Sequence, residues 1–156
     1  MMKTYYLAYG SNLNERQMKR RCPDAYKVGT SFIDGYRLMF KGSKTGSYLT
    51  IEKADGHHVP VGVWLVSERD LASLDVYEGC PSFYYKKWVN VQLGNKNATQ
   101  GKIKALVYIM HEERKLGCPT KFYVDTCLEG YDDFGFDKRY LLEALKYSLE
   151  DKDENN

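Results

Sequence analysis

Residues 7–14 have the sequence LAYGSNLN, and this stretch joins a predicted strand to a predicted helix. The residues that lead into it, 3–9, are rich in β-branched and aromatic side chains and favour a strand, with Tyr9 on one face and Tyr6 on the other. Gly10 interrupts that pattern, and residues 14–21 then favour a helix that Pro23 ends. The sequence therefore predicts a strand, a tight turn and a helix in immediate succession.

The turn itself has two open interpretations. In the simpler one, Gly10 permits a tight bend, and a side-chain oxygen of Ser11, Asn12 or Asn14 caps the helix. In the other, the junction points unpaired backbone N–H groups and the positive end of the helix dipole at a ligand. Such an arrangement suits an anion or a developing oxyanion. Local chemistry alone favours the simpler interpretation.

Length and charge exclude several classes of protein. The chain has 156 residues and a formal net charge of +2, which argues against nucleic acid as a partner, and the basic run at residues 19–21 is expected to be a solvated helix face. The length suits one domain, predicted over residues 1–150, and the charged residues 151–156 predict a disordered tail. No apolar run is long enough to cross a membrane, and strand-like sequence begins too early for a signal peptide. We expect a cytoplasmic protein without membrane contacts; the sequence does not indicate its oligomeric state.

Cysteine and histidine residues give no sign of a metal site. The histidines are too isolated to form a ligand cluster, so no metal is predicted. The cysteines have no C-x-x-C pairing and no histidine at zinc-finger spacing, which predicts free thiols at Cys22, Cys80, Cys118 and Cys127.

The remainder of the chain is rich in predicted strands, which cover residues 32–40, 47–53, 59–66, 84–93 and 103–110. Helices are predicted at three places. Residues 67–70, SERD, resemble a capping box that opens a helix ending at Gly79. A second helix opens at Pro119 and ends near Gly130, and the last begins at Asp137. Together these elements predict an α+β fold with a mixed-strand, β-barrel-like core and flanking α-helices.

Glu78 is the acidic residue that stands out. Leu71, Leu74 and Glu78 are spaced i, i+3, i+7, so the apolar face that docks this helix also carries Glu78 inward. Burial raises the pKa of a carboxyl group, and so does the negative end of a helix dipole. A carboxyl in that position can exchange a proton near neutral pH. In the alternative interpretation, Glu78 lies at a frayed helix end and reaches water. Asp75, one turn earlier, is the weaker candidate.

Two motifs at a fixed distance identify a family resemblance. YGSNL at residues 9–13 is followed by DVYEGCPSFY at residues 75–84, which contains the pattern E-G-x-P-x-x-Y. Together they resemble the γ-glutamylcyclotransferase-like superfamily, in particular its small bacterial and AIG2-like members, and the resemblance runs over most of the chain. Position 80 is often aromatic in such proteins, so Cys80 leaves the shape of the pocket wall open.

The resemblance implies a reaction and a set of site residues. Members of the superfamily convert γ-glutamyl amides to 5-oxoproline and a free amine, through attack of the substrate's own α-amino group on its γ-carbonyl, and they need no cofactor. Glu78 corresponds to the catalytic glutamate, which acts first as a base and then as an acid. The implied substrate-binding residues are those of the turn and three pocket tyrosines: Tyr9, Gly10, Ser11, Asn12, Leu13, Asn14, Tyr84, Tyr108 and Tyr123.

Three hypotheses about function remain open at this level. The first is a cyclotransferase acting on a γ-glutamyl amine or a γ-glutamyl amino acid. The second is a non-catalytic module that binds a small metabolite or anion in the same pocket. The third, an RNA-binding surface of tyrosines and lysines, is weakened by the near-neutral charge. Each pocket tyrosine also has a plain alternative as core filler with a hydrogen-bonded hydroxyl. The sequence does not determine whether the turn holds a substrate carboxylate or the oxyanion.

Overall fold

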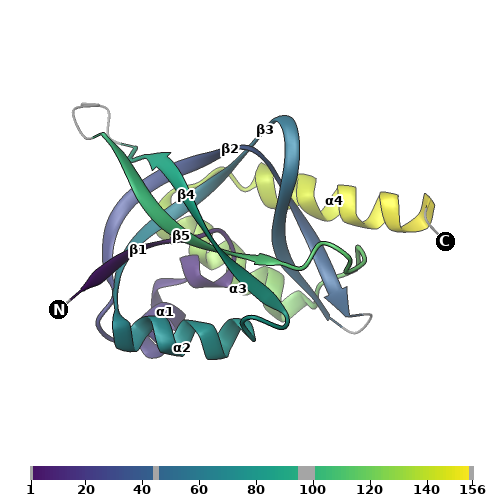
Figure 1. The fold of residues 1–156 in the computed structure, drawn as a ribbon. Coiled ribbons are helices and arrows are strands. Elements are labelled where there is room, and N and C mark those ends of the chain that lie inside the picture. Colours follow the sequence, from purple (N-terminus) through teal and green to yellow (C-terminus); the bar gives the residue numbers. More distant parts are fainter. Residues whose placement is uncertain (1, 44–45, 95–100, 155–156) are drawn as a thin grey trace.

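A curved, mixed sheet forms the centre of the protein (Figure 1). The computed structural model describes residues 2–43, 46–94 and 101–154. Its five strands lie in the order β2-β3-β1-β5-β4. Their bounds are β1 Lys3–Ala8, β2 Tyr26–Ser43, β3 Gly46–Ser67, β4 Tyr84–Gln92 and β5 Lys102–Met110. The helical elements are the 3-10 turn η1 (Ser11–Leu13), α1 (Glu15–Arg21), α2 (Glu68–Glu78), α3 (Lys121–Phe134) and α4 (Arg139–Glu154).

The predicted α+β class is confirmed, but the sheet is not a closed barrel. Within the described residues, the edge strands β2 and β4 form no ladder with each other. They approach at one end, where the Gly94 N–H donates to the Thr30 carbonyl (2.6 Å). The core is thus barrel-like in curvature and open in its hydrogen bonding.

Strand β1 occupies the middle of the sheet. It pairs antiparallel with β3 and parallel with β5, so both of its edges are hydrogen-bonded. Both of its faces are covered as well, because Tyr6, Leu7 and Ala8 are each at most 3% exposed. The turn that follows β1 therefore begins in the interior of the protein.

Strands β2 and β3 form one long hairpin, which differs from the prediction. The predicted strands 47–53 and 59–66 belong to the single strand β3, and β2 begins at Tyr26 rather than at residue 32. Pairing passes directly from Asp34↔His58 to Tyr36↔Lys53, so the intervening residues bulge out of the ladder. Two separate strands were predicted because the bulge carries turn-like residues, although the ladder continues across it.

The predicted start of α2 is confirmed. The Ser67 hydroxyl accepts a hydrogen bond from the Asp70 N–H (3.1 Å), and the Asp70 carboxylate accepts one from the Ser67 N–H (3.2 Å), which completes the capping box. Gly79 ends the helix in the left-handed conformation, at φ 61°. These caps determine where Glu78, the last residue of α2, lies.

The predicted end of α3 near Gly130 is wrong, because the helix continues to Phe134. Gly130 lies inside the helix, where a Cβ atom would come within 2.7 Å of the Asn14 backbone nitrogen and of Leu13 Cβ. The glycine is therefore explained by close packing of α3 against η1. The glycine that the sequence analysis interpreted as the end of the helix instead allows the helix to contact η1.

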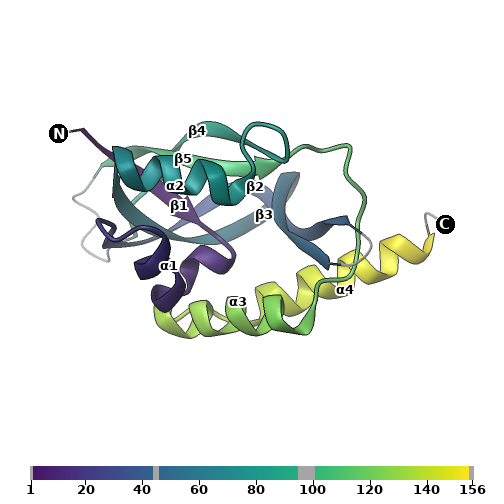
Figure 2. The same cartoon turned by 90° about the horizontal axis from the view of Figure 1, so that it is seen from below.

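The helices cover two sides of the sheet (Figure 2). Helices α3 and α4 follow each other along one side, and α2 crosses the opposite side, so that η1 and α1 lie between α2 and α3. Helix α4 continues to Glu154, so the segment predicted as a tail is helical over its first residues; 155 and 156 lie outside the described residues. None of the helices in the described part of the chain is long and apolar enough to cross a membrane.

Candidate functional site

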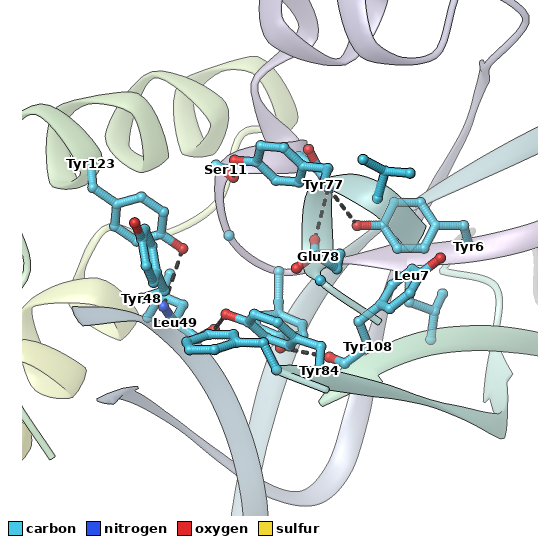
Figure 3. A pocket seen from close by; sticks show the side chains of 16 residues that line it. Tyr6, Leu7, Ser11, Tyr48, Leu49, Tyr77, Glu78, Tyr84, Tyr108 and Tyr123 are labelled. Atoms are coloured by element: carbon cyan, nitrogen blue, oxygen red, sulfur yellow. Dashed lines mark hydrogen bonds between the residues drawn. The ribbon is translucent and has the colours of Figure 1, made fainter. Parts of the chain in front are cut away.

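A cavity of about 340 Å³ opens where β1 runs into the turn (Figure 3). Residues of β1, η1, β3, α2, β4, β5 and α3 all contribute to its lining. Half of the described residues that line it are aromatic, and Glu78 is the one charged residue among them. The aromatic residues are Tyr6, Tyr9, Tyr48, Tyr77, Phe83, Tyr84, Tyr108 and Tyr123.

Most of the residues predicted for the site meet at this cavity. Those that line it are Glu78, Tyr9, Gly10, Ser11, Asn12, Tyr84, Tyr108 and Tyr123. Leu13 and Asn14 are fully buried beneath the turn and lie outside the lining. Cys80 and Asp75 lie outside it too, whereas Phe83, three residues after Cys80, is part of the lining.

Glu78 faces the cavity from the end of α2 (Figure 3). Its carboxylate accepts one hydrogen bond in the described structure, from the Asn12 side-chain amide at 3.3 Å. Burial raises the pKa of Glu78 to about 7, and the positive charge of Arg21 opposes part of that rise. Glu78 therefore points inward with the apolar face of the helix, as one of the two interpretations of the sequence expected. It does not lie at a frayed helix end in open water, as the other interpretation expected.

The cavity side of the turn offers several hydrogen-bond donors. The Leu13 and Asn14 N–H groups bond back to the Gly10 and Ser11 carbonyls. The N–H groups of Ser11 and Asn12, at the start of the 3-10 turn, have no acceptor within the described part of the chain. The Ser11 hydroxyl shares a hydrogen bond with the Tyr77 hydroxyl (2.9 Å). Trp64 holds the turn from behind, because its Nε1 donates to the Asn12 carbonyl (3.0 Å).

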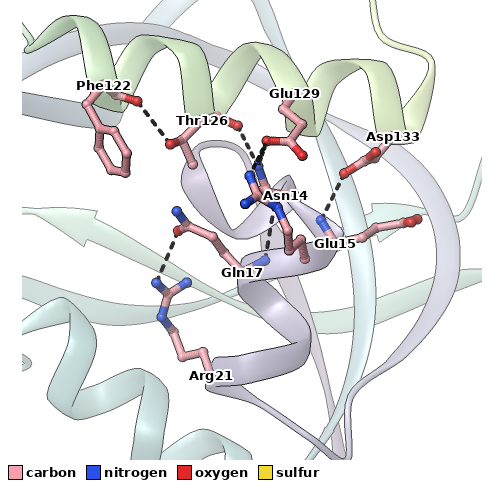
Figure 4. Close-up of polar contacts among 9 residues, drawn as sticks. Asn14, Glu15, Gln17, Arg21, Phe122, Thr126, Glu129 and Asp133 are labelled. Atoms are coloured by element: carbon pink, nitrogen blue, oxygen red, sulfur yellow. Dashed lines mark hydrogen bonds and ion pairs between the residues drawn. The ribbon is translucent and has the colours of Figure 1, made fainter.

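The opposite side of the turn is bound to α3 (Figure 4). Asn14 caps α1 by accepting from the Gln17 N–H (3.1 Å). Its amide nitrogen donates to the Thr126 carbonyl (3.1 Å) and to Glu129 Oε2 (2.9 Å). Asn14 therefore fixes the turn, and the simpler interpretation of the sequence, helix capping, describes what this residue does.

The walls of the cavity are held by hydroxyl groups that bond to the backbone. The Tyr84 hydroxyl donates to the Leu49 carbonyl (2.7 Å), and the Leu49 N–H donates to the Tyr123 hydroxyl (3.1 Å). The Tyr9 hydroxyl donates to the Tyr108 carbonyl (2.7 Å). Burial raises the pKa of Tyr9, Tyr84 and Tyr123 well above the usual value, so these phenols are neutral. They form a rigid, uncharged wall.

Tyr108 lines the cavity, but its hydroxyl bonds to α2. It donates to Asp75 Oδ1 at 2.5 Å, and Lys86 pairs with the other oxygen of Asp75 at 3.0 Å. Asp75 thus ties β5 to the helix that carries Glu78. This structural position differs from the acid–base role considered for Asp75 from the sequence.

Several lining residues were not predicted as part of the site. Tyr6 was placed on the strand face opposite Tyr9, yet both line the cavity, because Tyr9 lies beyond the end of β1. Tyr77 directly precedes Glu78, and its place in the second motif was a usable signal. Tyr48 and Leu49 come from the start of β3, and only the folded topology brings them to the turn that follows β1.

Among the described residues, no three or more His, Cys, Asp or Glu side chains lie close enough together to hold a metal ion. The four cysteines are free thiols.

The fold and the cavity define a class of small α+β proteins in which a curved mixed sheet surrounds a tyrosine-lined pocket. One solved structure, described as a gamma-glutamyl cyclotransferase, superposes with a TM-score of 0.80 at 24% identity, covering 92% of this chain and 86% of that chain. An uncharacterized protein from Homo sapiens superposes with a TM-score of 0.79 at 25% identity, covering 92% of this chain and 87% of that one.

The sequence then identifies the family. Residues 6–125 match the family model "Gamma-glutamyl cyclotransferase, AIG2-like", and the chain belongs to this family. A gamma-glutamylcyclotransferase of Bos taurus is 34% identical over 87 residues, which are 51% of this chain and 46% of the relative. The chain therefore spans about half the length of the curated relative it matches. The resemblance noted from the two motifs is confirmed.

Proposed function

We propose that this protein is a cyclotransferase that converts a γ-glutamyl amine or a γ-glutamyl amino acid to 5-oxoproline and a free amine, without a cofactor. The observation that carries the proposal is the position of Glu78, a carboxyl with a pKa of about 7 that faces the turn across the cavity. Membership of the family supports the class of reaction.

The reaction requires one proton to be moved between two nitrogens. The α-amino nitrogen of the substrate attacks the γ-carbonyl carbon, which forms the C–N bond of the lactam, and the bond from that carbon to the leaving nitrogen breaks. The attacking nitrogen loses a proton and the leaving nitrogen gains one. The Glu78 carboxylate accepts the first proton and then returns it. A pKa of about 7 suits both steps near neutral pH.

The surroundings of Glu78 fit the positioning task. Ring closure depends on holding the amine ~3 Å from the carbonyl carbon, and a rigid wall restricts the substrate to such folded conformations. The N–H groups of Ser11 and Asn12 are available to the substrate carboxylate or to the oxyanion. Because Glu78 is the one charged group among the described residues of the lining, neutral donors bind the anionic parts of the substrate.

Product formation tests the proposal. The purified protein is incubated with γ-glutamyl amines, γ-glutamyl dipeptides and glutathione, and 5-oxoproline is measured by mass spectrometry. We expect release from at least one of these classes. Calorimetric titration with the same compounds and with 5-oxoproline identifies the alternative, since binding without any product would indicate a non-catalytic metabolite-binding module. The absence of product from every one of these compounds would overturn the proposal, whether or not they bind.

A further inference from the structure

Arg21 contacts the site from outside the cavity. It is the last residue of α1 and is half-buried. Its Nη1 donates to Asn12 Oδ1, and its Nη2 donates to Gln17 Oε1 at 3.3 Å, as Figure 4 shows for the latter bond. The guanidinium carbon lies 3.3 Å from the centroid of the Tyr77 ring, a cation–π contact. Arg21 is thus held in one place by three neighbours.

The bond from Arg21 determines how the Asn12 amide is oriented. An amide has an acceptor end and a donor end, whereas a guanidinium can only donate. Because Arg21 occupies Oδ1, the Nδ2 end of Asn12 faces the cavity. There Nδ2 donates to the Tyr6 hydroxyl (2.8 Å) and to Glu78 Oε1 (3.3 Å).

The orientation of the Asn12 amide also determines whether the Tyr6 hydroxyl acts as a donor or as an acceptor. Its oxygen accepts from Asn12, so its own proton is left for another acceptor, and no group in the described part of the chain takes it. Tyr6 lines the cavity, and burial raises the pKa of its phenol well above the usual value, so the proton stays on the oxygen. Tyr6 is therefore a donor that faces the substrate space.

We propose that Arg21 is a positioning residue of this site: through the directed chain Arg21 to Asn12 to Tyr6 and Glu78, it fixes the Asn12 amide and makes Tyr6 a hydrogen-bond donor to the substrate. This series of hydrogen bonds also polarises each successive donor toward the cavity, where none of the described lining residues is a cation. The kinetic part of this proposal rests on the proposed cyclotransferase function, whereas the orientation of Asn12 does not.

Among the described residues, Arg21 is the cation that acts on Glu78, and it lowers the pKa of that carboxyl. The other titratable groups that interact with Glu78 are neutral near pH 7, because burial raises their pKa values: Tyr6, Tyr9, Cys80, Tyr84 and Tyr108. Removing the charge at position 21 therefore leaves desolvation unopposed, and Glu78 becomes a weaker acid.

Arg21→Met tests the chain of hydrogen bonds, with Arg20→Met as the matched control, because Arg20 is the solvent-exposed neighbour on the same helix. Carboxyl ¹³C NMR follows the titration of Glu78, and ¹⁵N NMR follows the Asn12 side-chain amide, both without substrate. We expect Arg21→Met to raise the Glu78 midpoint by about half a pH unit and to shift the Asn12 amide resonances. Arg20→Met should behave as wild type.

Kinetics add a second readout. We expect Arg21→Met to lower kcat by ~10-fold with a smaller change in KM, because fixed donors matter most in the transition state. The acid limb of its pH–rate profile should move to higher pH. Arg21→Lys keeps the charge without the planar fork, so it should restore the midpoint of Glu78 but only part of kcat.

Asn12→Asp interrupts the same series of hydrogen bonds at a second point, in case Arg21→Met does not fold. Aspartate can still accept from Arg21 but cannot donate to Tyr6 or Glu78, so we expect the same fall in kcat and a raised Glu78 midpoint. A wild-type Glu78 midpoint in whichever of the two variants folds would overturn the proposal. An absence of turnover in the wild type would instead overturn the proposed function, and the NMR titrations would still decide the role of Arg21.

Discussion

Two glutamates lie on opposite sides of the same turn and show opposite behaviour. On the cavity side, Asn12 donates to Glu78 at 3.3 Å; on the α3 side, Asn14 donates to Glu129 at 2.9 Å. Burial raises the pKa of Glu78 to about 7. Hydrogen bonds from Arg16 and Asn14 lower the pKa of Glu129 below its usual value.

The difference follows from how well each carboxylate is solvated. The Glu129 side chain is 44% exposed to water and receives a second, charged donor, since Arg16 lies 2.7 Å from its Oε2. Glu78 has one long hydrogen bond in a cavity walled by neutral phenols. A well-solvated carboxylate is a weak base that holds structure, whereas a poorly solvated one retains the basicity that proton transfer needs.

Glutamine at the two positions gives the largest expected contrast. Glu78→Gln keeps the size and polarity of the side chain but removes the group that carries the proton, so we expect the rate of 5-oxoproline release to fall by a factor of ~100 or more. Glu129→Gln keeps an oxygen that accepts from Asn14 and loses only an exposed ion pair, so its rate should change by less than ~3-fold. Equal rates for the Glu78 variant and the wild type would contradict the assignment.

Alanine at Gly130 tests whether the α3 side of the turn positions the cavity side. The added Cβ would meet Asn14 and Leu13 backbone atoms at 2.7–2.8 Å. Alanine gains ~1 kcal/mol of helix propensity, but overpacking against backbone costs more, so we expect a net loss of about 2 kcal/mol in the free energy of unfolding and a raised KM. Denaturant unfolding and steady-state kinetics measure both effects.

Gly101→Ala is the control for that substitution, because a Cβ at this position meets no atom of the described residues within 4 Å. It should leave both the unfolding midpoint and KM unchanged. If Gly130→Ala were as stable as this control, the packing of α3 against η1 would not be what fixes the turn.

Short-range signals in the sequence predicted much of the fold. The capping box at Ser67 and the left-handed Gly79 depend on neighbouring residues, so the bounds of α2 could be read directly. The single long strand β3 and the end of α3 were mispredicted because pairing and packing partners distant in the chain override local turn cues. A glycine that ends a helix and a glycine that permits close packing inside a helix look the same in the sequence. At Gly130 only the contact with Asn14 in the folded protein distinguishes the two.

The candidate site could be predicted where it follows the two motifs. Residues 9–12 and Glu78 line the cavity because a strand end and a helix end carry them there. Tyr6 was missed because alternation along β1 assigned it to another face, although β1 is buried on both faces. Arg21 was missed as well, since it acts through Asn12 and looked like part of a solvated basic run.

The raised pKa of Glu78 predicts a dependence of stability on pH that needs no substrate. Between about pH 4.5 and pH 7 the folded protein holds a proton on Glu78 that the unfolded chain has lost, so the stability contribution of this group falls as pH rises through that window. Glutamine has no such dependence. We expect the free energy of unfolding of Glu78→Gln to equal that of the wild type near pH 4.5 and to exceed it by about 1.5 kcal/mol at pH 8. This is less than the full pKa shift would give, because the cavity opens to solvent and solvent screens the effect.

Denaturant unfolding of both proteins at a series of pH values gives that difference directly, because groups other than Glu78 titrate equally in the two and cancel. A difference that stays constant from pH 4.5 to pH 8 would show that Glu78 titrates normally and is well solvated. In that case the contrast between Glu78 and Glu129 would disappear.

The smallest expected effect concerns two buried tyrosines that differ in one hydrogen bond. The Tyr108 hydroxyl donates to Asp75 at 2.5 Å, whereas the Tyr131 hydroxyl is buried without a partner among the described residues. Tyr108→Phe leaves Asp75 short of a donor, so the free energy of unfolding should fall by about 1 kcal/mol. Tyr131→Phe removes an unpaired polar group and should be neutral or slightly stabilising.

The kinetics of Tyr108→Phe show whether the Tyr108 hydroxyl only anchors α2 or also takes part in the reaction. Because the proton of this hydroxyl is committed to Asp75, it is not available to the substrate, and kcat should change by less than ~3-fold. A loss of kcat as large as that of Glu78→Gln would instead place the Tyr108 hydroxyl in the reaction itself. Since Tyr108 and Glu78 are joined through α2, the double variant should lose no more activity than Glu78→Gln alone.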